Sequence, residues 1–146
     1  MTVIMDIRTA PSRTGTENRP GLQILVAEDV LPNQIMTEIL LNQAGHVVTI
    51  VENGAAAVES ARCRNYDLIL MDLQMPVMDG LEATRQIRAL PDKARDIPIV
   101  ALTANLTTDE IAACYAAGMQ GHLTKPISPA KLIEIITRLR GQAATA

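Results

Sequence analysis

Five polar or charged side chains follow short apolar runs of this sequence, and together they offer the chemistry of a metal and phosphoryl site. In chain order they are Glu28, Asp29, Asp72, Thr103 and Lys125. If the runs are parallel strands, their carboxyl ends meet at one edge of a sheet, where Asp29 and Asp72 must lie close together. Carboxylates held together either share a proton or bind a hard cation, and ligation by oxygen alone is typical of Mg²⁺. We therefore expect a Mg²⁺ site at this edge.

Asp72 follows its run without a second acid beside it, which makes it the candidate nucleophile. A carboxylate next to Mg²⁺, with a lysine and a hydroxyl aimed at the same point, is arranged to accept a phosphoryl group. The metal and Lys125 would neutralise charge on the transferring group while the carboxylate attacks in line. Glu28 and Asp29 would hold the metal. Each acid taken alone is better explained as a cap for the next helix, but capping leaves the combination with Thr103 and Lys125 unexplained.

The elements that must position these residues alternate regularly along the chain. Short apolar runs, typical of strands buried on both faces, cover residues 22–27, 47–51, 68–71, 97–102 and a more polar edge candidate at 121–124. Segments of helical period cover residues 32–44, 54–64, 81–90, 107–118 and 128–140. This alternation without hairpins predicts an α/β fold, a doubly wound sheet of five parallel strands in the flavodoxin-like (βα)5 order 2-1-3-4-5.

The helices at the two ends of the folded part have apolar stripes that predict which side is buried. In the helix at 32–44, Ile35 and Ile39 lie on the predicted inner stripe, while Thr37 and Leu41 are expected outside. In the last helix the expected core positions are Leu132, Ile133, Ile136 and Leu139. Ile135 falls off that stripe and is either ordinary surface scatter or part of a partner surface, together with Tyr115 of the preceding helix.

Composition bounds the domain organisation. Residues 1–20 are polar and without period, and predict a flexible tail or linker; residues 21–141 form one domain, and residues 142–146 a disordered tail. The chain of 146 residues has 13 Lys and Arg against 16 Asp and Glu, a net charge of −3. This mildly acidic balance and an aromatic content of only 1% argue against nucleic acid as a direct partner.

The cysteines and the apolar segments indicate the compartment. Cys63 and Cys114 share no metal-ligand spacing with His46 and His122, and are typical of reduced thiols. No segment is apolar for long enough to span a membrane, and residues 1–11 lack the apolar core of a secretory signal. We expect a cytoplasmic domain.

Four segments, in this order and spacing, resemble the receiver domain of response regulators in two-component signalling, of the type found in hybrid sensor histidine kinases. They are ILVAEDVLPNQ (24–34), DLILMDLQMPVMDGLEAT (67–84), IVALTAN (99–105) and GHLTKPI (121–127). Each segment is weak to moderate evidence alone, but four in order are specific, and the resemblance covers residues 22–140. It implies a phosphorelay domain that carries out its own phosphorylation and slow dephosphorylation and is otherwise not an enzyme.

The resemblance also implies a role for each residue of the metal site. Asp72 matches the phosphoacceptor aspartate of the family and Asp29 the direct Mg²⁺ ligand. Glu28 matches the acid that reaches the metal through water. Gln74 would lend its backbone carbonyl to the metal, and its side chain would govern the access of water to the acyl phosphate.

Two further residues match the part of the family that senses the phosphoryl group. Thr103 matches the hydroxyl that hydrogen-bonds this group, and Lys125 the basic residue that pairs with it; the bond from Lys125 to Pro126 is cis in the family. His122 occupies the position of the aromatic switch residue, which is usually Tyr or Phe, and is either a switch or a solvent-facing residue on an edge strand. A switching histidine should respond to pH near neutrality, and identical pH profiles of the activated population in wild type and His122→Tyr would refute that hypothesis.

Partners are likewise implied by the resemblance. The phosphoryl donor would be a sensor histidine kinase or a histidine phosphotransfer domain, docked on the first helix, where Gln34 and Glu38 are expected to face outward. The fourth helix, fifth strand and fifth helix would form the switching face and a possible homodimer surface. Val30 stands where Asn is frequent in the family, and we expect no loss of phosphorylation from it.

Two other classes of protein have a similar fold or similar site residues. A phosphatase of the haloacid-dehalogenase type also has an aspartate nucleophile and Mg²⁺, but it needs a second Asp where Gln74 stands, and it usually carries a cap domain. A flavin- or nucleotide-binding protein of flavodoxin type needs a phosphate loop after the first strand, where Glu28 and Asp29 would repel phosphates. Formation of a labile acyl phosphate would favour the receiver domain, whereas sustained turnover of a phosphate ester would favour the phosphatase.

Overall fold

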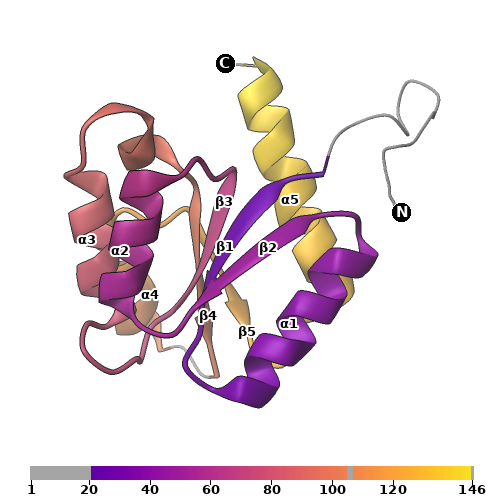
Figure 1. Ribbon diagram of the computed structural model, residues 1–146, viewed down its shortest axis with the longest axis horizontal. Coiled ribbons are helices and arrows are strands. Elements are labelled where there is room, and N and C mark those ends of the chain that lie inside the picture. The colour runs from indigo at the N-terminus through magenta and orange to yellow at the C-terminus, as the bar shows by residue number, and fades with distance from the viewer. Residues whose placement is uncertain (1–20, 105–106, 146) are drawn as a thin grey trace.

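The computed structural model describes residues 21–104 and 107–145, which form one parallel sheet covered by helices on both faces (Figure 1). The five strands are β1 (Gln23–Ala27), β2 (Val47–Val51), β3 (Leu68–Asp72), β4 (Ile99–Thr103) and β5 (Gly121–Thr124). The helices are α1 (Leu31–Gln43), α2 (Gly54–Cys63), α3 (Gly80–Arg88), α4 (Thr108–Ala117) and α5 (Pro129–Thr145), with a short 3₁₀ turn η1 (Asp92–Asp96) before β4. All neighbouring strands are parallel, in the order β2-β1-β3-β4-β5, which confirms the predicted topology.

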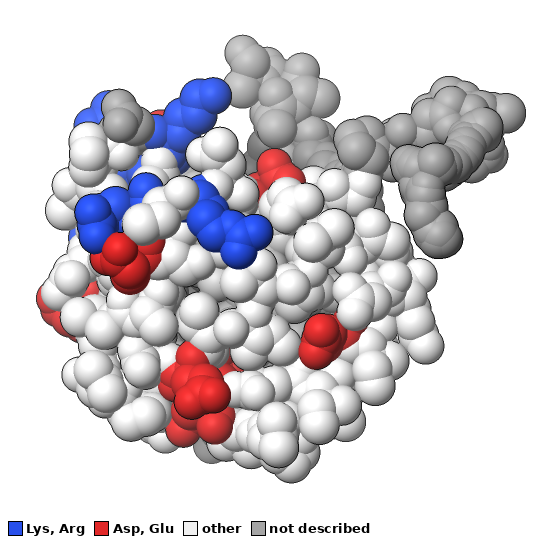
Figure 2. Space-filling model, viewed as in Figure 1, with Lys and Arg blue, Asp and Glu red and all other residues white. Residues whose placement is uncertain are grey.

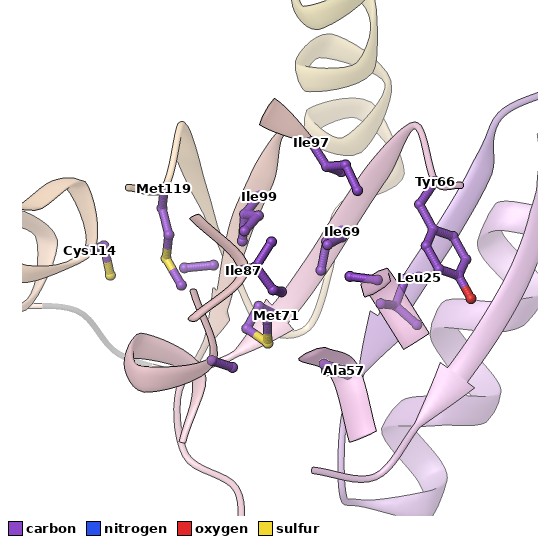
Figure 3. Close-up of a cluster of buried hydrophobic side chains, with 14 residues drawn as sticks. Leu25, Ala57, Tyr66, Ile69, Met71, Ile87, Ile97, Ile99, Cys114 and Met119 are labelled. Atoms are coloured by element: carbon purple, nitrogen blue, oxygen red, sulfur yellow. The ribbon is translucent and has the colours of Figure 1, made fainter. Parts of the chain in front are cut away.

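Alternation along the central strands divides the core into two layers, because successive side chains point to opposite faces. Helices α2, α3 and α4 cover one face and α1 and α5 the other (Figure 1). The first layer (Figure 3) includes the strand residues Leu25, Ala27, Ile69, Met71, Ile99 and Ala101. The second includes Ile24, Val26, Leu68, Leu70, Val100 and Leu102. Tyr66 is the aromatic side chain of these layers, which are otherwise built mainly from aliphatic residues.

The predicted rotation of α1 is wrong. Thr37 and Leu41 are buried, with 3% and 0% exposure, whereas Ile35 and Ile39 are about half exposed, at 50% and 51%. Apolar residues occur around nearly the whole helix, so that its periodicity did not distinguish the inner from the outer side. The helix therefore presents an apolar face to solvent.

The last helix differs from its prediction in two ways. Ile135 is buried and Ile133 is 58% exposed, the reverse of the expected stripe. Helix α5 also continues through Thr145, so the predicted disordered tail at 142–146 is wrong as far as 145, because Gln142 and the two alanines after it favour helix. The predicted tail at 1–20, and residue 146, lie outside the described residues.

The loop between β3 and α3 is braced by close backbone approaches at two glycines. Gly54 N–H donates to the carbonyl of Met78 (2.9 Å), and Gly80 N–H donates to that of Leu73 (3.0 Å). A Cβ at Gly80 would lie 2.2 Å from the carbonyl oxygen of Asp72, and one at Gly54 only 2.3 Å from that of Met78. Both positions therefore require glycine, and both hold the segment that follows Asp72.

Within this loop Val77 has a strained backbone. Its φ is 71°, in the left-handed region, and Met78 N–H donates to the carbonyl of Pro76 (2.7 Å), as in a γ-turn. A β-branched residue rarely adopts this conformation, which costs on the order of 1–3 kcal/mol. Val77 is 82% exposed, so that little packing offsets the strain.

We expect Val77→Gly to raise the free energy of unfolding by about 1 kcal/mol, since the relief of strain exceeds the added entropy of the unfolded chain. Urea denaturation followed by circular dichroism measures this change. Val47→Gly is the matched control, because Val47 is a half-exposed valine in strand β2. It should destabilise the protein, and equal losses for the two variants would contradict the explanation.

Candidate functional site

The carboxyl ends of β1 and β3 bring three acids together. Glu28 and Asp29 follow β1 directly, Asp72 is the last residue of β3, and these strands are neighbours in the sheet. One carboxylate oxygen from each residue lies within 4.8 Å of the others. The predicted approach of Asp29 to Asp72 is therefore found, with Glu28 in the same cluster.

Lys125 reaches the cluster from the loop after β5. Its Nζ lies 2.9 Å from Glu28 Oε1 and 2.9 Å from Asp72 Oδ2, so it joins acids from two different strands. Its backbone N–H donates to the carbonyl of Thr103 (2.8 Å), which ties the lysine loop to the end of β4. The peptide bond between Lys125 and Pro126 is cis, as the resemblance implies.

The three acids differ in their exposure to solvent. Glu28 is fully buried and Asp72 is 6% exposed, whereas Asp29 is open to solvent. Burial raises the pKa of Glu28, although the bonds from Lys125 and from the Val30 N–H oppose the shift. Burial also disfavours the charged form of Lys125, but its two carboxylate partners outweigh this effect and raise its pKa above the ordinary value. Glu28 and Lys125 thus lie at the poorly solvated floor of the site, and Asp29 lies at its solvent-exposed rim.

Backbone and amide groups fix the two buried acids. Asp72 Oδ1 accepts from the Gln74 N–H (3.2 Å), which leaves Oδ2 to Lys125. Glu28 Oε2 accepts from the Val30 N–H (3.1 Å), and the Gln34 side chain donates to the Glu28 carbonyl (2.6 Å). Sequence reasoning missed this role of Gln34, which it assigned to a docking surface, because an amide six residues away carries no local signal of the contact.

The donor set suits Mg²⁺. Its three carboxylates supply only oxygen, and one ammonium balances one of their three charges, which leaves two formal negative charges. A divalent hard cation that keeps several waters matches this arrangement, with its open side at Asp29. Gln74 is exposed directly beside Asp72, and the predicted use of its carbonyl as a ligand stays a prediction.

Thr103 and the candidate switch residue His122 lie on neighbouring strands, β4 and the edge strand β5. Thr103, the last residue of β4, is 9% exposed and pairs in register with Thr124 of β5. His122 is half-buried on the opposite face of β5 from the buried Leu123. Its Nδ1 is buried and has no hydrogen-bond partner among the described residues. No described contact links it to the acids, and its action as a switch stays a prediction.

Sequence comparison identifies the family. The sequence model of the response regulator receiver domain matches residues 24–137. The chain belongs to this family. The receiver domain is 39% identical over 123 residues to the sensor protein GacS of Pseudomonas syringae, a match that covers 83% of this chain but 14% of that protein. It is also 34% identical over 120 residues to the sensory/regulatory protein RpfC of Xanthomonas campestris, covering 82% of this chain and 16% of that protein.

Solved structures agree with this family. The receiver domain of sensor histidine kinase PA1611 from Pseudomonas aeruginosa, which holds a magnesium ion in its active site cleft, is 45% identical. Its TM-score is 0.77, and the match covers 83% of this chain and 98% of that chain. The receiver domain of Saccharomyces cerevisiae Ssk1, crystallised with the histidine phosphotransfer protein Ypd1, has a TM-score of 0.73 and 31% identity, covering 81% and 88%.

The sensor proteins GacS and RpfC are much longer than this chain, which spans about one seventh of GacS. The receiver domains of hybrid sensor histidine kinases are therefore the part that this sequence resembles, as predicted. Among the described residues, none of the helices has the length and apolar character that crossing a bilayer demands.

Proposed function

We propose that this receiver domain accepts a phosphoryl group on Asp72 from a phosphohistidine of a sensor histidine kinase or a histidine phosphotransfer domain. One observation carries the proposal: the nearly buried Asp72 carboxylate lies beside Lys125, Glu28 and Asp29 at the carboxyl edge of the sheet. That combination provides a nucleophile, a cation and a metal-binding set at one point. Nothing else in the described residues combines these three groups.

In the transfer step an Asp72 carboxylate oxygen bonds to phosphorus while the phosphorus–nitrogen bond to the donor imidazole breaks. The electron pair of that bond leaves with the imidazole, and an acyl phosphate forms. Asp29, Asp72, the Gln74 carbonyl and, through water, Glu28 would hold a Mg²⁺ ion, which would supply positive charge to offset the charge of the phosphoryl oxygens. Lys125 then pairs with the phosphoryl group.

The new phosphoryl group would change the contacts of Thr103 and His122, and this change would pass to the rest of the domain. Thr103 hydrogen-bonds the phosphoryl oxygens in our proposal, and His122 follows it as the switch residue of the face formed by α4, β5 and α5. Tyr115 and Ile133 are exposed on α4 and α5 and would belong to a homodimer surface there. Ile135, which the sequence left open as surface scatter or part of a partner surface, is buried and is neither.

The exposed apolar face of α1 supports a docking site for the phosphohistidine donor. Leu31, Ile35 and Ile39 follow one another at four-residue spacing and are 50% exposed or more, and Met36 lies beside them. Met36 also lines a hollow of about 20 Å³ together with Lys125, so this face adjoins the site. A cytoplasmic location is consistent with the free thiols of Cys63 and Cys114.

Incubation with acetyl phosphate tests the proposal. With Mg²⁺ present, we expect one phosphoryl group per chain in a form that hydroxylamine removes, and we expect EDTA to abolish its formation. Intact-mass spectrometry counts the group. Sustained hydrolysis of p-nitrophenyl phosphate would instead favour the phosphatase reading, and labelling that ignores EDTA would contradict the metal role.

A further inference from the structure

A basic hollow lies far from the acidic site, and the proposed phosphoryl transfer makes no use of it. It has a volume of about 840 Å³ and lies between the ends of α2 and α3 and the turn η1. Four cationic side chains line it, against a single described acid, Asp96; the cations are Arg62, Arg64, Lys93 and Arg95. On an acidic chain this is a pronounced local excess of positive charge.

The hollow and the acidic site lie at opposite edges of the sheet. The hollow is built from the segments that lead from α2 into β3 and from α3 into β4, at the amino ends of those strands. The acids stand at the carboxyl ends, so a peptide segment lying in the hollow does not reach them. Figure 2 shows the Lys and Arg side chains of the visible face gathered in its upper-left part. Occupation of the hollow is therefore sterically compatible with donor binding.

Most of the cations in the hollow form no ion pair with a carboxylate among the described side chains. Arg62 pairs with Glu59, and Arg64 lies over the Tyr66 ring at 5.9 Å from its centroid. Lys93 and Arg95 form no ion pair with any side chain that the structure describes, and both are exposed. Their charges are available to an anionic ligand at little desolvation cost.

Arg88 holds the turn η1 in place by hydrogen bonds and adds a positive charge next to it. Its Nη1 donates to the carbonyls of Arg95 (2.8 Å) and Ile97 (2.7 Å), and its Nε and Nη2 donate to that of Gly118 (2.9 and 2.7 Å). These acceptors carry no formal charge; burial lowers the pKa of Arg88, and the nearby charge of Asp96 opposes the shift only in part. The turn that carries Lys93 and Arg95 is thus held in place before any ligand arrives.

The shape and lining favour an extended peptide over a nucleotide. Apolar groups of Ala61, Leu90, Pro91 and Ala94 lie between the cations. A second hollow of about 370 Å³ shares Arg64 and Lys93 with the first, so the two form one trough. The second hollow adds one acid, Asp67, whose carboxylate accepts from the Gln23 N–H (2.8 Å), so the four cations face two described acids in all. The trough offers no free aromatic face for a base, because Tyr66 is 7% exposed and faces Arg64.

We infer that this trough, defined by Arg62, Arg64, Lys93 and Arg95, binds an extended acidic peptide segment of a partner protein. Carboxylates of the segment pair with the cations along the rim, and its small apolar side chains cover the apolar groups between them. The inference stands independently of phosphorylation, because its residues and its test do not involve Asp72.

The test uses a fluorescein-labelled peptide of alternating Glu and Ala with the full chain. We expect saturable binding by fluorescence anisotropy that weakens as salt is added. Arg64→Glu/Lys93→Glu should weaken it about tenfold or more. The matched control Lys131→Glu/Arg138→Glu makes the same change of charge at two exposed cations of α5 and should leave the affinity within about twofold.

A thiol in the trough locates the bound peptide. Cys63 lines the hollow and is exposed, whereas Cys114 is buried. Saturating peptide should slow the alkylation of Cys63 by iodoacetamide several-fold, at mildly alkaline pH because the hydrogen bond to Glu59 raises the pKa of this thiol. Unchanged alkylation, equal losses of affinity in both double variants, or stronger protection by ATP than by the peptide would each overturn the inference.

Discussion

Asp72→Asn is expected to reduce phosphoryl incorporation from acetyl phosphate to background, a loss of at least about a hundredfold. The amide oxygen of asparagine is a poor nucleophile, yet it can still accept from the Gln74 N–H as the carboxylate does. The variant therefore removes the chemistry and retains the local hydrogen bond. Intact-mass spectrometry after incubation with Mg²⁺ measures the loss.

The matched control is Asp79→Asn, the same substitution at an exposed acid of the same loop. Asp79 caps α3 by accepting from the Glu82 N–H (2.9 Å), a role that asparagine fills equally well. Asp79→Asn should be phosphorylated at the wild-type rate. Full labelling of Asp72→Asn at a single new site would place the nucleophile elsewhere.

Lys125→Met should separate metal binding from phosphoryl transfer. Methionine keeps the length of the side chain but removes the ammonium that lies 2.9 Å from both Glu28 and Asp72. Transfer from acetyl phosphate should slow by about a hundredfold or more, the usual effect of losing one charge-stabilising group. Mg²⁺ affinity should hold or rise, because the metal no longer competes with a cation for these carboxylates.

Opposite directions for the two measurements distinguish this explanation from simple misfolding, which would lower both. Isothermal titration with Mg²⁺ gives the affinity, and stopped labelling reactions give the rate. Lys131→Met replaces an exposed lysine of α5 and should change neither quantity. A parallel loss of affinity and rate in Lys125→Met would show that Lys125 organises the metal site instead of the transfer.

The topology and the acidic cluster were predictable because both depend on local pattern. Buried parallel strands read as short apolar runs, and the rule for strand ends then places Asp29 beside Asp72. The helix start at residue 107 also depends on local pattern, because Thr107 and Glu110, three residues apart, form a capping box with both of its hydrogen bonds present. Hydrogen bonds between residues far apart in the sequence could not be predicted in this way. Arg88 is an example, because its acceptors lie up to 32 residues away.

Helix rotation was the part that local pattern could not decide. In α1 the apolar residues exceed what one buried face can hold, so Leu41 packs inside while Ile35 and Ile39 remain outside. In α5 the apolar residues at 132, 133, 135 and 136 permit two stripes, and packing on the sheet selects Ile135 over Ile133. Apolar helix residues that the core does not bury therefore indicate a surface for a partner.

The identity of the phosphorylated residue is the most direct test of the central proposal. The receiver domain, labelled with acetyl phosphate and Mg²⁺, is reduced with borohydride, which converts an aspartyl phosphate into homoserine, and is then digested and sequenced by mass spectrometry. We predict homoserine at position 72 and at no other position. Homoserine at position 29, or a phosphoryl group on a serine, threonine or histidine that withstands hydroxylamine, would contradict the proposal.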